Sequence, residues 1–137
     1  MDIEPDPSHR EAAMKFVHVA TRTKDLDKAI AFYGMLGLQL QRKKELTANQ
    51  ATLAFLAQPE GDFAIELVYN WGKDTPYEGG QRFGHFAFDV DDLDLLFERL
   101  VKAGATPVRR PALLQDEGPK IAFIADPDGN EIELIER

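Results

Sequence analysis

The sequence predicts an α+β protein built from two tandem copies of one module, each a strand followed by a helix and further strands. Shifting the chain by 67 positions aligns KFVHVATRTKDLDKAIAFYGMLG with RFGHFAFDVDDLDLLFERLVKAG, giving seven identities over positions 16–37. Composition alone would give about one or two. A second block, LAFLAQPEG at 53–61, aligns with IAFIADPDG at 121–129 in a shift of 68 and shares five of nine residues. The two copies are therefore placed at 14–70 and 82–137.

Each copy begins with a short β-rich segment, at 16–20 and 83–88, which predicts its first strand. Asp25 and Asp92 stand at the position of a helix N-cap, directly before apolar residues that recur every three or four positions. Gly37 and Gly104 follow each apolar pattern, where a residue with left-handed backbone ends a helix. The sequence therefore predicts one helix per copy, between the aspartate and the glycine.

A tight turn and a linker complete the organisation of the chain. Pro-Glu-Gly at 59–61 and Pro-Asp-Gly at 127–129 are typical of turns between two strands, so each copy ends in a hairpin. The segment 71–81 is rich in Gly, Pro and polar residues and predicts a linker between the copies. Residues 1–13 lie outside the repeat and are expected to form a flexible extension, so that 14–137 is a single domain.

Composition excludes several classes of protein. The 137 residues are 44% hydrophobic with a formal net charge of −8, and they contain no cysteine. That charge disfavours nucleic acid and anionic membrane surfaces as partners. No apolar run reaches the roughly 20 residues of a membrane span, and the N-terminus lacks a secretory pattern. A cytoplasmic protein is expected, without disulfides, thiolate metal ligands or a cysteine nucleophile.

Two histidines and two glutamates are equivalent in the repeat: His18 with His85, and Glu66 with Glu133. Each stands inside an otherwise apolar strand, where alternation turns it away from its apolar neighbours. A single strand histidine or glutamate is more often structural or solvated than functional. A two-fold-related set of two imidazoles and two carboxylates instead favours a metal site. With waters added, this donor set suits octahedral Ni²⁺ or Co²⁺, or Zn²⁺ with expanded coordination.

The motifs around these residues resemble glyoxalase I (lactoylglutathione lyase), in the vicinal oxygen chelate superfamily, over residues 14–137. The family's opening, a ligand histidine, an arginine, D-L and then F-Y, is matched by His18, Arg22, 25–26 and 32–33. Its E-L-x-x-N-W-G string stands at 66–72, its G-H at 84–85, and its A-F-x-x-D-P-D-G and I-E-L-I-E strings at 122–129 and 132–136. The string at 66–72 is much more specific than the histidine and D-P-D-G motifs.

The resemblance implies paired βαβββ modules whose curved mixed sheets surround a metal site. It implies a homodimer in which each site takes His18 and Glu66 from one chain and His85 and Glu133 from the other. The substrate would be the hemithioacetal of methylglyoxal and glutathione, isomerised to S-D-lactoylglutathione through a metal-bound enediolate. Glu133 would be the principal catalytic base and Glu66 its symmetric counterpart.

The resemblance also implies substrate contacts. Arg22 and Asn70 match positions that hold glutathione in the family, and Trp71 is expected either to wall that pocket or to pack within its loop. The loop before the A-F motif reads LLQDEGPK, where family members place a lysine and glycines, so Lys120 is expected to compensate from a shifted position. The directions of Arg82, Arg109 and Arg110 stay open, and the compact length resembles the bacterial-type, Ni²⁺- or Co²⁺-preferring enzymes.

Other readings remain open at this point. An epimerase, an extradiol dioxygenase or a thiol transferase of the same superfamily would use related chemistry, the last with a different thiol. The fourth ligand, Glu66, argues against the dioxygenase, and the string at 66–72 argues against the epimerase. A metal-free drug-binding protein on the same fold needs a pocket but no inward set of two histidines and two glutamates.

Overall fold

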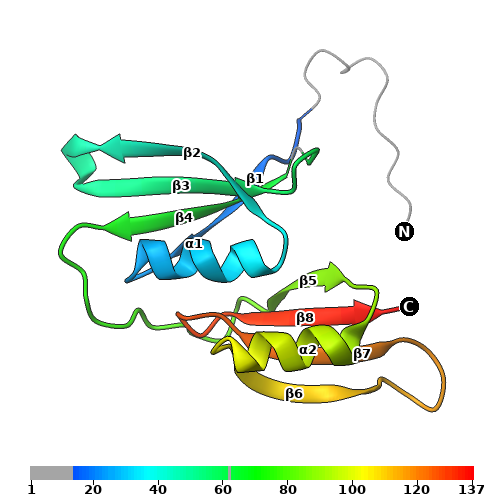
Figure 1. Cartoon of the computed structure of the whole chain (residues 1–137). Helices are drawn as coiled ribbons and strands as arrows, with labels where there is room; N and C mark the ends of the chain where they lie inside the picture. The colour runs from blue at the N-terminus through cyan, green and yellow to red at the C-terminus, as the bar shows by residue number, and fades with distance from the viewer. Residues whose placement is uncertain (1–13, 62) are drawn as a thin grey trace.

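A computed structural model describes residues 14–61 and 63–137, and the expected extension at 1–13 lies outside this range. The first module contains β1 (His18–Arg22), α1 (Leu26–Met35), β2 (Gln39–Leu46), the short 3₁₀ helix η2 (Thr47–Asn49), β3 (Ala51–Ala57) and β4 (Ala64–Asn70). The second contains β5 (His85–Asp89), α2 (Leu93–Lys102), β6 (Thr106–Leu113), β7 (Lys120–Ala125) and β8 (Glu131–Glu136). Each module is thus βαβββ, which confirms the predicted α+β class (Figure 1).

Each module forms its own four-stranded mixed sheet, in the order β1-β4-β3-β2 or β5-β8-β7-β6. The first strand of each module pairs in parallel with the last, while the other pairs are antiparallel. The segment 71–84 contains no helix or strand and connects the two modules (Figure 1). Among the described residues, no helix has the length and apolar character that a membrane crossing requires.

The helix ends follow the local sequence signals. The Asp25 carboxylate accepts a hydrogen bond from the Lys28 backbone N–H at 3.1 Å, and the Asp92 carboxylate accepts one from that of Leu95 at 3.2 Å. These contacts satisfy N–H groups that have no partner within the helix. Gly37 and Gly104 adopt φ values of 90° and 108°, in the left-handed region where a side chain is strained.

The first strand of each module begins two residues later than predicted, at His18 rather than position 16 and at His85 rather than position 83. The difference follows from the partner strand, because the parallel register of β1 begins with His18 opposite Ala64. Phe16 precedes this register and is 70% exposed, with its ring stacked on that of Phe63 at 5.0 Å. An apolar side chain alone does not extend a strand beyond its pairing partner.

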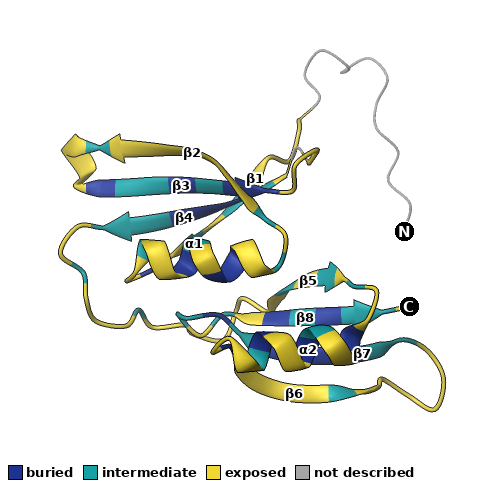
Figure 2. Cartoon of the chain, viewed as in Figure 1, coloured by how far each residue is buried: buried dark blue, intermediate teal, exposed yellow. Residues whose placement is uncertain are grey.

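A single apolar core lies on the helix-covered faces of both sheets. Helix α1 packs on β2, β3 and β4, and α2 packs on β6, β7 and β8 (Figures 1 and 2). Buried residues of both modules share this core, including Phe32, Tyr33, Leu56, Leu67, Leu93, Phe97, Ile124, Ile132 and Leu134. The two modules are therefore joined through the sides of their sheets that the helices cover.

One buried polar contact links the modules. The Tyr33 hydroxyl donates to the Asp126 carboxylate at 2.6 Å, and the same carboxylate accepts from the backbone N–H groups of Asp128 and Asn130 at 2.9 and 2.8 Å. Burial raises the pKa of the fully buried Tyr33, and the neighbouring Asp126 charge raises it further. The equivalent positions in the opposite modules are Leu100 and Gln58, so the repeat does not duplicate this link.

We expect Tyr33→Phe to destabilise the fold by about 1–3 kcal/mol at neutral pH, because buried Asp126 loses a donor. The folded protein holds Tyr33 neutral, whereas the unfolded chain ionises it near the ordinary pKa of 10.0. Stability from this group is therefore flat below pH 10 and falls by about 1.4 kcal/mol per pH unit above it. Denaturant unfolding at pH 8 and pH 11 should show a steeper loss in the parent than in the variant; equal losses would contradict this account.

Candidate functional site

The first histidine–glutamate pair joins two neighbouring strands. His18 begins β1 and Glu66 is the third residue of β4, and the His18 Nε2 atom is 2.8 Å from a Glu66 carboxylate oxygen. The parallel register places Ala20 opposite Glu66, so both side chains project from the same face of the sheet. The Glu66 side chain is 11% exposed and that of His18 39% exposed, which leaves the imidazole open to a ligand.

The second module repeats this pair. The His85 Nε2 atom on β5 lies 3.2 Å from a Glu133 carboxylate oxygen on β8, with side-chain exposures of 40% and 18%. An aromatic ring meets each imidazole edge-on: Phe55 at 5.7 Å from His18, and Phe123 at 5.2 Å from His85. We call each pair with its phenylalanine a half-site, the first made of His18, Glu66 and Phe55 and the second of His85, Glu133 and Phe123.

The half-sites lie on the faces of the two sheets that the helices leave free. Glu66 alternates along β4 with Ile65 and Leu67, whose side chains are buried in the common core. Glu133 alternates in the same way with the buried residues Ile132 and Leu134. Because successive side chains of a strand point to opposite faces, each half-site points away from the core that joins the modules.

One chain therefore presents two separate histidine–glutamate pairs, both of residue types that bind metals. In the described ranges, no three or more His, Cys, Asp or Glu side chains converge as a metal-binding group. Each pair offers one imidazole nitrogen and one carboxylate oxygen, both donors suited to divalent transition metals. Two such pairs, brought together from two chains, would supply the mixed four-ligand set, so the residues present fit a divalent metal shared between subunits.

The expected substrate residues lie near one end of the first half-site. Arg22 ends β1 opposite Val68, and Asn70 ends β4, so both project from the face that carries Glu66. The Asn70 amide donates to the Tyr77 hydroxyl at 2.9 Å, and Arg22 and Tyr77 both line a cavity of about 280 Å³. Trp71 is 40% exposed, and its indole N–H donates to the Thr52 hydroxyl at 2.8 Å.

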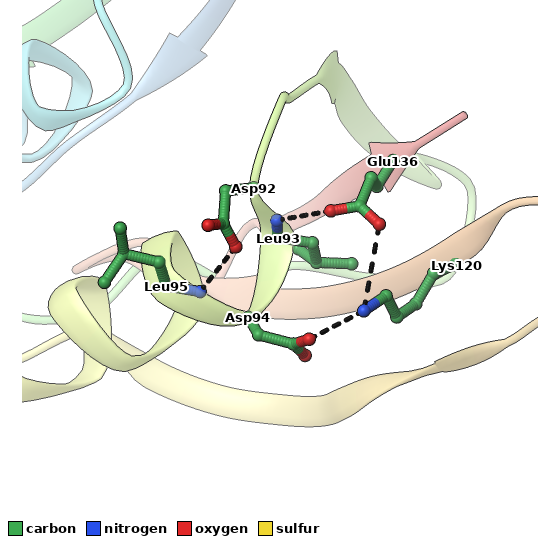
Figure 3. Close-up of polar contacts among 6 residues, drawn as sticks. All are labelled: Asp92, Leu93, Asp94, Leu95, Lys120 and Glu136. Carbon is green, nitrogen blue, oxygen red and sulfur yellow. Dashed lines mark hydrogen bonds and ion pairs between the residues drawn. The ribbon is translucent and has the colours of Figure 1, made fainter.

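Lys120 is not brought to a half-site. It lies opposite Glu136 on the next strand. Glu136 is three positions from Glu133, an odd number, so Lys120 projects from the helix-covered face and not from the face of Glu133. Its ammonium contacts Asp94 at 2.6 Å and Glu136 at 3.7 Å (Figure 3). Glu136 also accepts a hydrogen bond from the Leu93 backbone N–H at the start of α2. These contacts join α2 to β7 and β8, and the hydrogen bond to Asp94 raises the pKa of Lys120.

Sequence reasoning overlooked two residues, Phe55 in the first half-site and Arg42 beside it. Arg42 on β2 stacks its guanidinium over the Phe55 ring, 4.4 Å from the ring centre, and Phe55 in turn contacts His18. The register of the antiparallel strands places Arg42, Phe55 and Glu66 in one row across the sheet. The identity of Phe55 with Phe123 in the repeat was the available signal for the phenylalanine, whereas Arg42 is revealed only by the register.

Comparisons with known proteins agree with this geometry. Residues 15–134 match the family model of the Glyoxalase/Bleomycin resistance protein/Dioxygenase superfamily. Lactoylglutathione lyase of Haemophilus influenzae is 41% identical over 126 residues, covering 90% of this chain and 93% of that protein. A probable lactoylglutathione lyase of Synechocystis is 39% identical, with coverages of 90% and 95%.

Solved structures give the same result. Glyoxalase I from Zea mays superposes with a TM-score of 0.83 at 38% identity, covering 90% of this chain and 44% of the maize chain, so the present chain spans less than half of that protein. The trypanothione-dependent glyoxalase I of Leishmania major gives a TM-score of 0.77 at 32% identity, with coverages of 90% and 87%. This chain belongs to the glyoxalase I (lactoylglutathione lyase) family of enzymes, within the glyoxalase, or vicinal oxygen chelate, superfamily.

Proposed function

We propose that this protein is a metal-dependent glyoxalase I that isomerises the hemithioacetal of methylglyoxal and glutathione to S-D-lactoylglutathione. The observation that carries the proposal is the pair of equivalent half-sites, each with a histidine and a glutamate in direct contact on a helix-free sheet face. Relatives about 40% identical over nine-tenths of the chain are named lactoylglutathione lyase, which supports the same reaction and thiol here.

The proposed active form is a homodimer. The half-sites of one chain point away from the core between its modules, so they cannot meet without separating that core. A two-fold pairing of chains brings the first half-site of one protomer against the second half-site of its partner, and forms two equal sites. Each site then contains His18 and Glu66 from one chain with His85 and Glu133 from the other.

These four side chains would hold the metal. When bound, a divalent cation supplies electrostatic stabilisation of the negative charge that develops on the two substrate oxygens, which lowers the barrier to removing a C–H proton. The mixture of two imidazole nitrogens and two carboxylate oxygens favours Ni²⁺ or Co²⁺, and accommodates Zn²⁺ with expanded coordination. The imidazoles remain fixed ligands, since each is held between its glutamate and a phenylalanine ring.

The glutamates would move the proton. The reaction shifts a hydrogen from C1 to C2 of the substrate, and one carboxylate can take the first proton and return it to the neighbouring carbon. Glu133 is the better principal base, because its contact with histidine is longer than that of Glu66, 3.2 against 2.8 Å, and its side chain is more exposed. Glu66 would be its symmetric counterpart, more firmly held as a ligand.

The glutathione moiety of the substrate is assigned to the ends of β1 and β4. Arg22 supplies a positive charge for a glutathione carboxylate, and Asn70 supplies amide hydrogen-bonding groups beside it. Trp71 would form an apolar wall there while its indole N–H stays bonded to Thr52. The ion pairs of Lys120 on the other face of its sheet hold it away from these contacts.

The first test is activity. After chelator treatment and addition of Ni²⁺, Co²⁺ or Zn²⁺, the protein should form thioester from methylglyoxal and glutathione, followed by ultraviolet absorbance. We expect Glu133→Gln to lower kcat by about 10²–10⁴-fold, because the amide cannot accept the proton. Glu98→Gln, on the exposed face of α2, serves as the control and should keep the parent rate. Full activity of Glu133→Gln would exclude Glu133 as the base.

Metal binding gives a second, separate test. The parent should retain one Ni²⁺ per chain after dialysis, measured by elemental analysis, and both His18→Ala and His85→Ala should lose it because each site needs both histidines. The third histidine, His9, lies outside the described residues, and His9→Ala serves as the control. Retention of one metal per chain in either half-site variant would contradict a shared four-ligand site.

A further inference from the structure

The helix-free face of the first sheet carries more positive charge than the proposed reaction accounts for. Arg42 and Lys44, which we call the β2 cation pair, occupy alternate positions of β2 and project from the same face as Glu66. Arg42 lies in one cross-strand row with Phe55 and Glu66. Lys44 lies in the next row, with Leu53 and Val68 between it and Arg22.

The charges of this pair are not neutralised within the described part of the chain, where neither Arg42 nor Lys44 forms an ion pair. The Arg42 guanidinium is instead held over the Phe55 ring at 4.4 Å. The protein as a whole has a net charge of −8, so two adjacent cations without an ion pair to any described residue are a local reversal of its charge beside the half-site. Such a reversal would attract a negatively charged group.

The order of strands places this charge on the opposite edge of the sheet from Arg22, the proposed contact of the glutathione moiety. β1, with Arg22, and β2 are the two edge strands of the sheet, three strand spacings or about 14 Å apart. The proposed metal ligands lie on β1 and β4, and the apolar side chains of Phe55 and Leu53 on β3 separate them from the β2 cation pair. With its glutathione moiety at Arg22 and its reacting carbons at the proposed metal ligands on β1 and β4, a substrate can reach the β2 cation pair by extending its aldehyde-derived part over Phe55.

We propose that the β2 cation pair recognises a negatively charged substituent on the aldehyde, so that the enzyme favours 2-oxoaldehydes that carry a carboxylate several bonds from the reacting carbons. This inference rests on the proposed glyoxalase I reaction and names its substrate class. Phe55 and Leu53 contact the apolar part of the substituent, and Arg42 and Lys44 pair with the carboxylate at its end. Arg42 and Lys44 are thus specificity-determining residues, separate from the metal ligands.

The test compares two aldehydes that differ by one carboxylate group. With glutathione and the metal-loaded enzyme, kcat/KM for 4-carboxyphenylglyoxal should exceed that for phenylglyoxal by about tenfold, the order expected for a hydrogen bond to a charged group. Arg42→Gln and Lys44→Gln should each reduce this ratio severalfold. Lys43→Gln is the matched control, since Lys43 is an exposed cation that lies opposite the buried Ala54 and projects from the other face. It should keep the ratio.

A binding measurement separates this inference from the proposed reaction. By calorimetry, S-(4-carboxybenzyl)glutathione should bind more tightly than S-benzylglutathione, with a preference that Arg42→Gln and Lys44→Gln remove and Lys43→Gln retains. Equal binding of the two compounds, or a preference unchanged in the variants, would overturn the inference.

The same variants distinguish two other roles for the β2 cation pair. If they weaken binding of S-benzylglutathione but not of its ethyl ester, the cations hold a glutathione carboxylate. If they dissociate the dimer, the cations contact the partner subunit. Either result overturns the assignment to the aldehyde. Failure to turn over any hemithioacetal would refute the proposed reaction, whereas turnover of methylglyoxal without the charge preference would refute this inference alone.

Discussion

The alternation of buried and outward side chains along β4 and β8 is the constraint on which the site depends. Ile65 and Leu67 must enter the core, so Glu66 must leave it, and Glu133 is placed in the same way by its own neighbours. A shift of one residue in either strand would turn the carboxylate into the apolar core and the apolar side chains out of it, at a cost no local contact could offset. Core packing therefore fixes where the two glutamates proposed as metal ligands lie.

The duplicated module explains both what is shared and what differs between the two halves. Each half repeats the strand order and the histidine–glutamate contact, which gives a two-fold set of donors. The link from Tyr33 to Asp126 occurs once, because Leu100 and Gln58 take the equivalent positions. The repeat thus accounts for the two equivalent histidine–glutamate pairs, while residues that differ between the modules form the buried polar contact that links them.

Most of the fold could be predicted from the sequence, because local signals and tertiary structure agree at the helix caps, the helix-ending glycines and the hairpin turns. The starts of β1 and β5 could not, since they depend on where the partner strand begins. The histidine–glutamate pairs follow from the repeat, but the ion pairs of Lys120 and the row from Arg42 to Glu66 depend on strand register. Register between distant segments has no local sequence signal.

The central claim, that each site is built from two chains, is tested most directly by mixed dimers of His18→Ala and His85→Ala chains carrying different purification tags. Each homodimer has a defect in both sites and should be inactive. The heterodimer combines both defects in one site and leaves the other intact, so it should regain about half of the parent activity. A heterodimer as inactive as the two homodimers would show that each chain contains its own site, and would contradict the account.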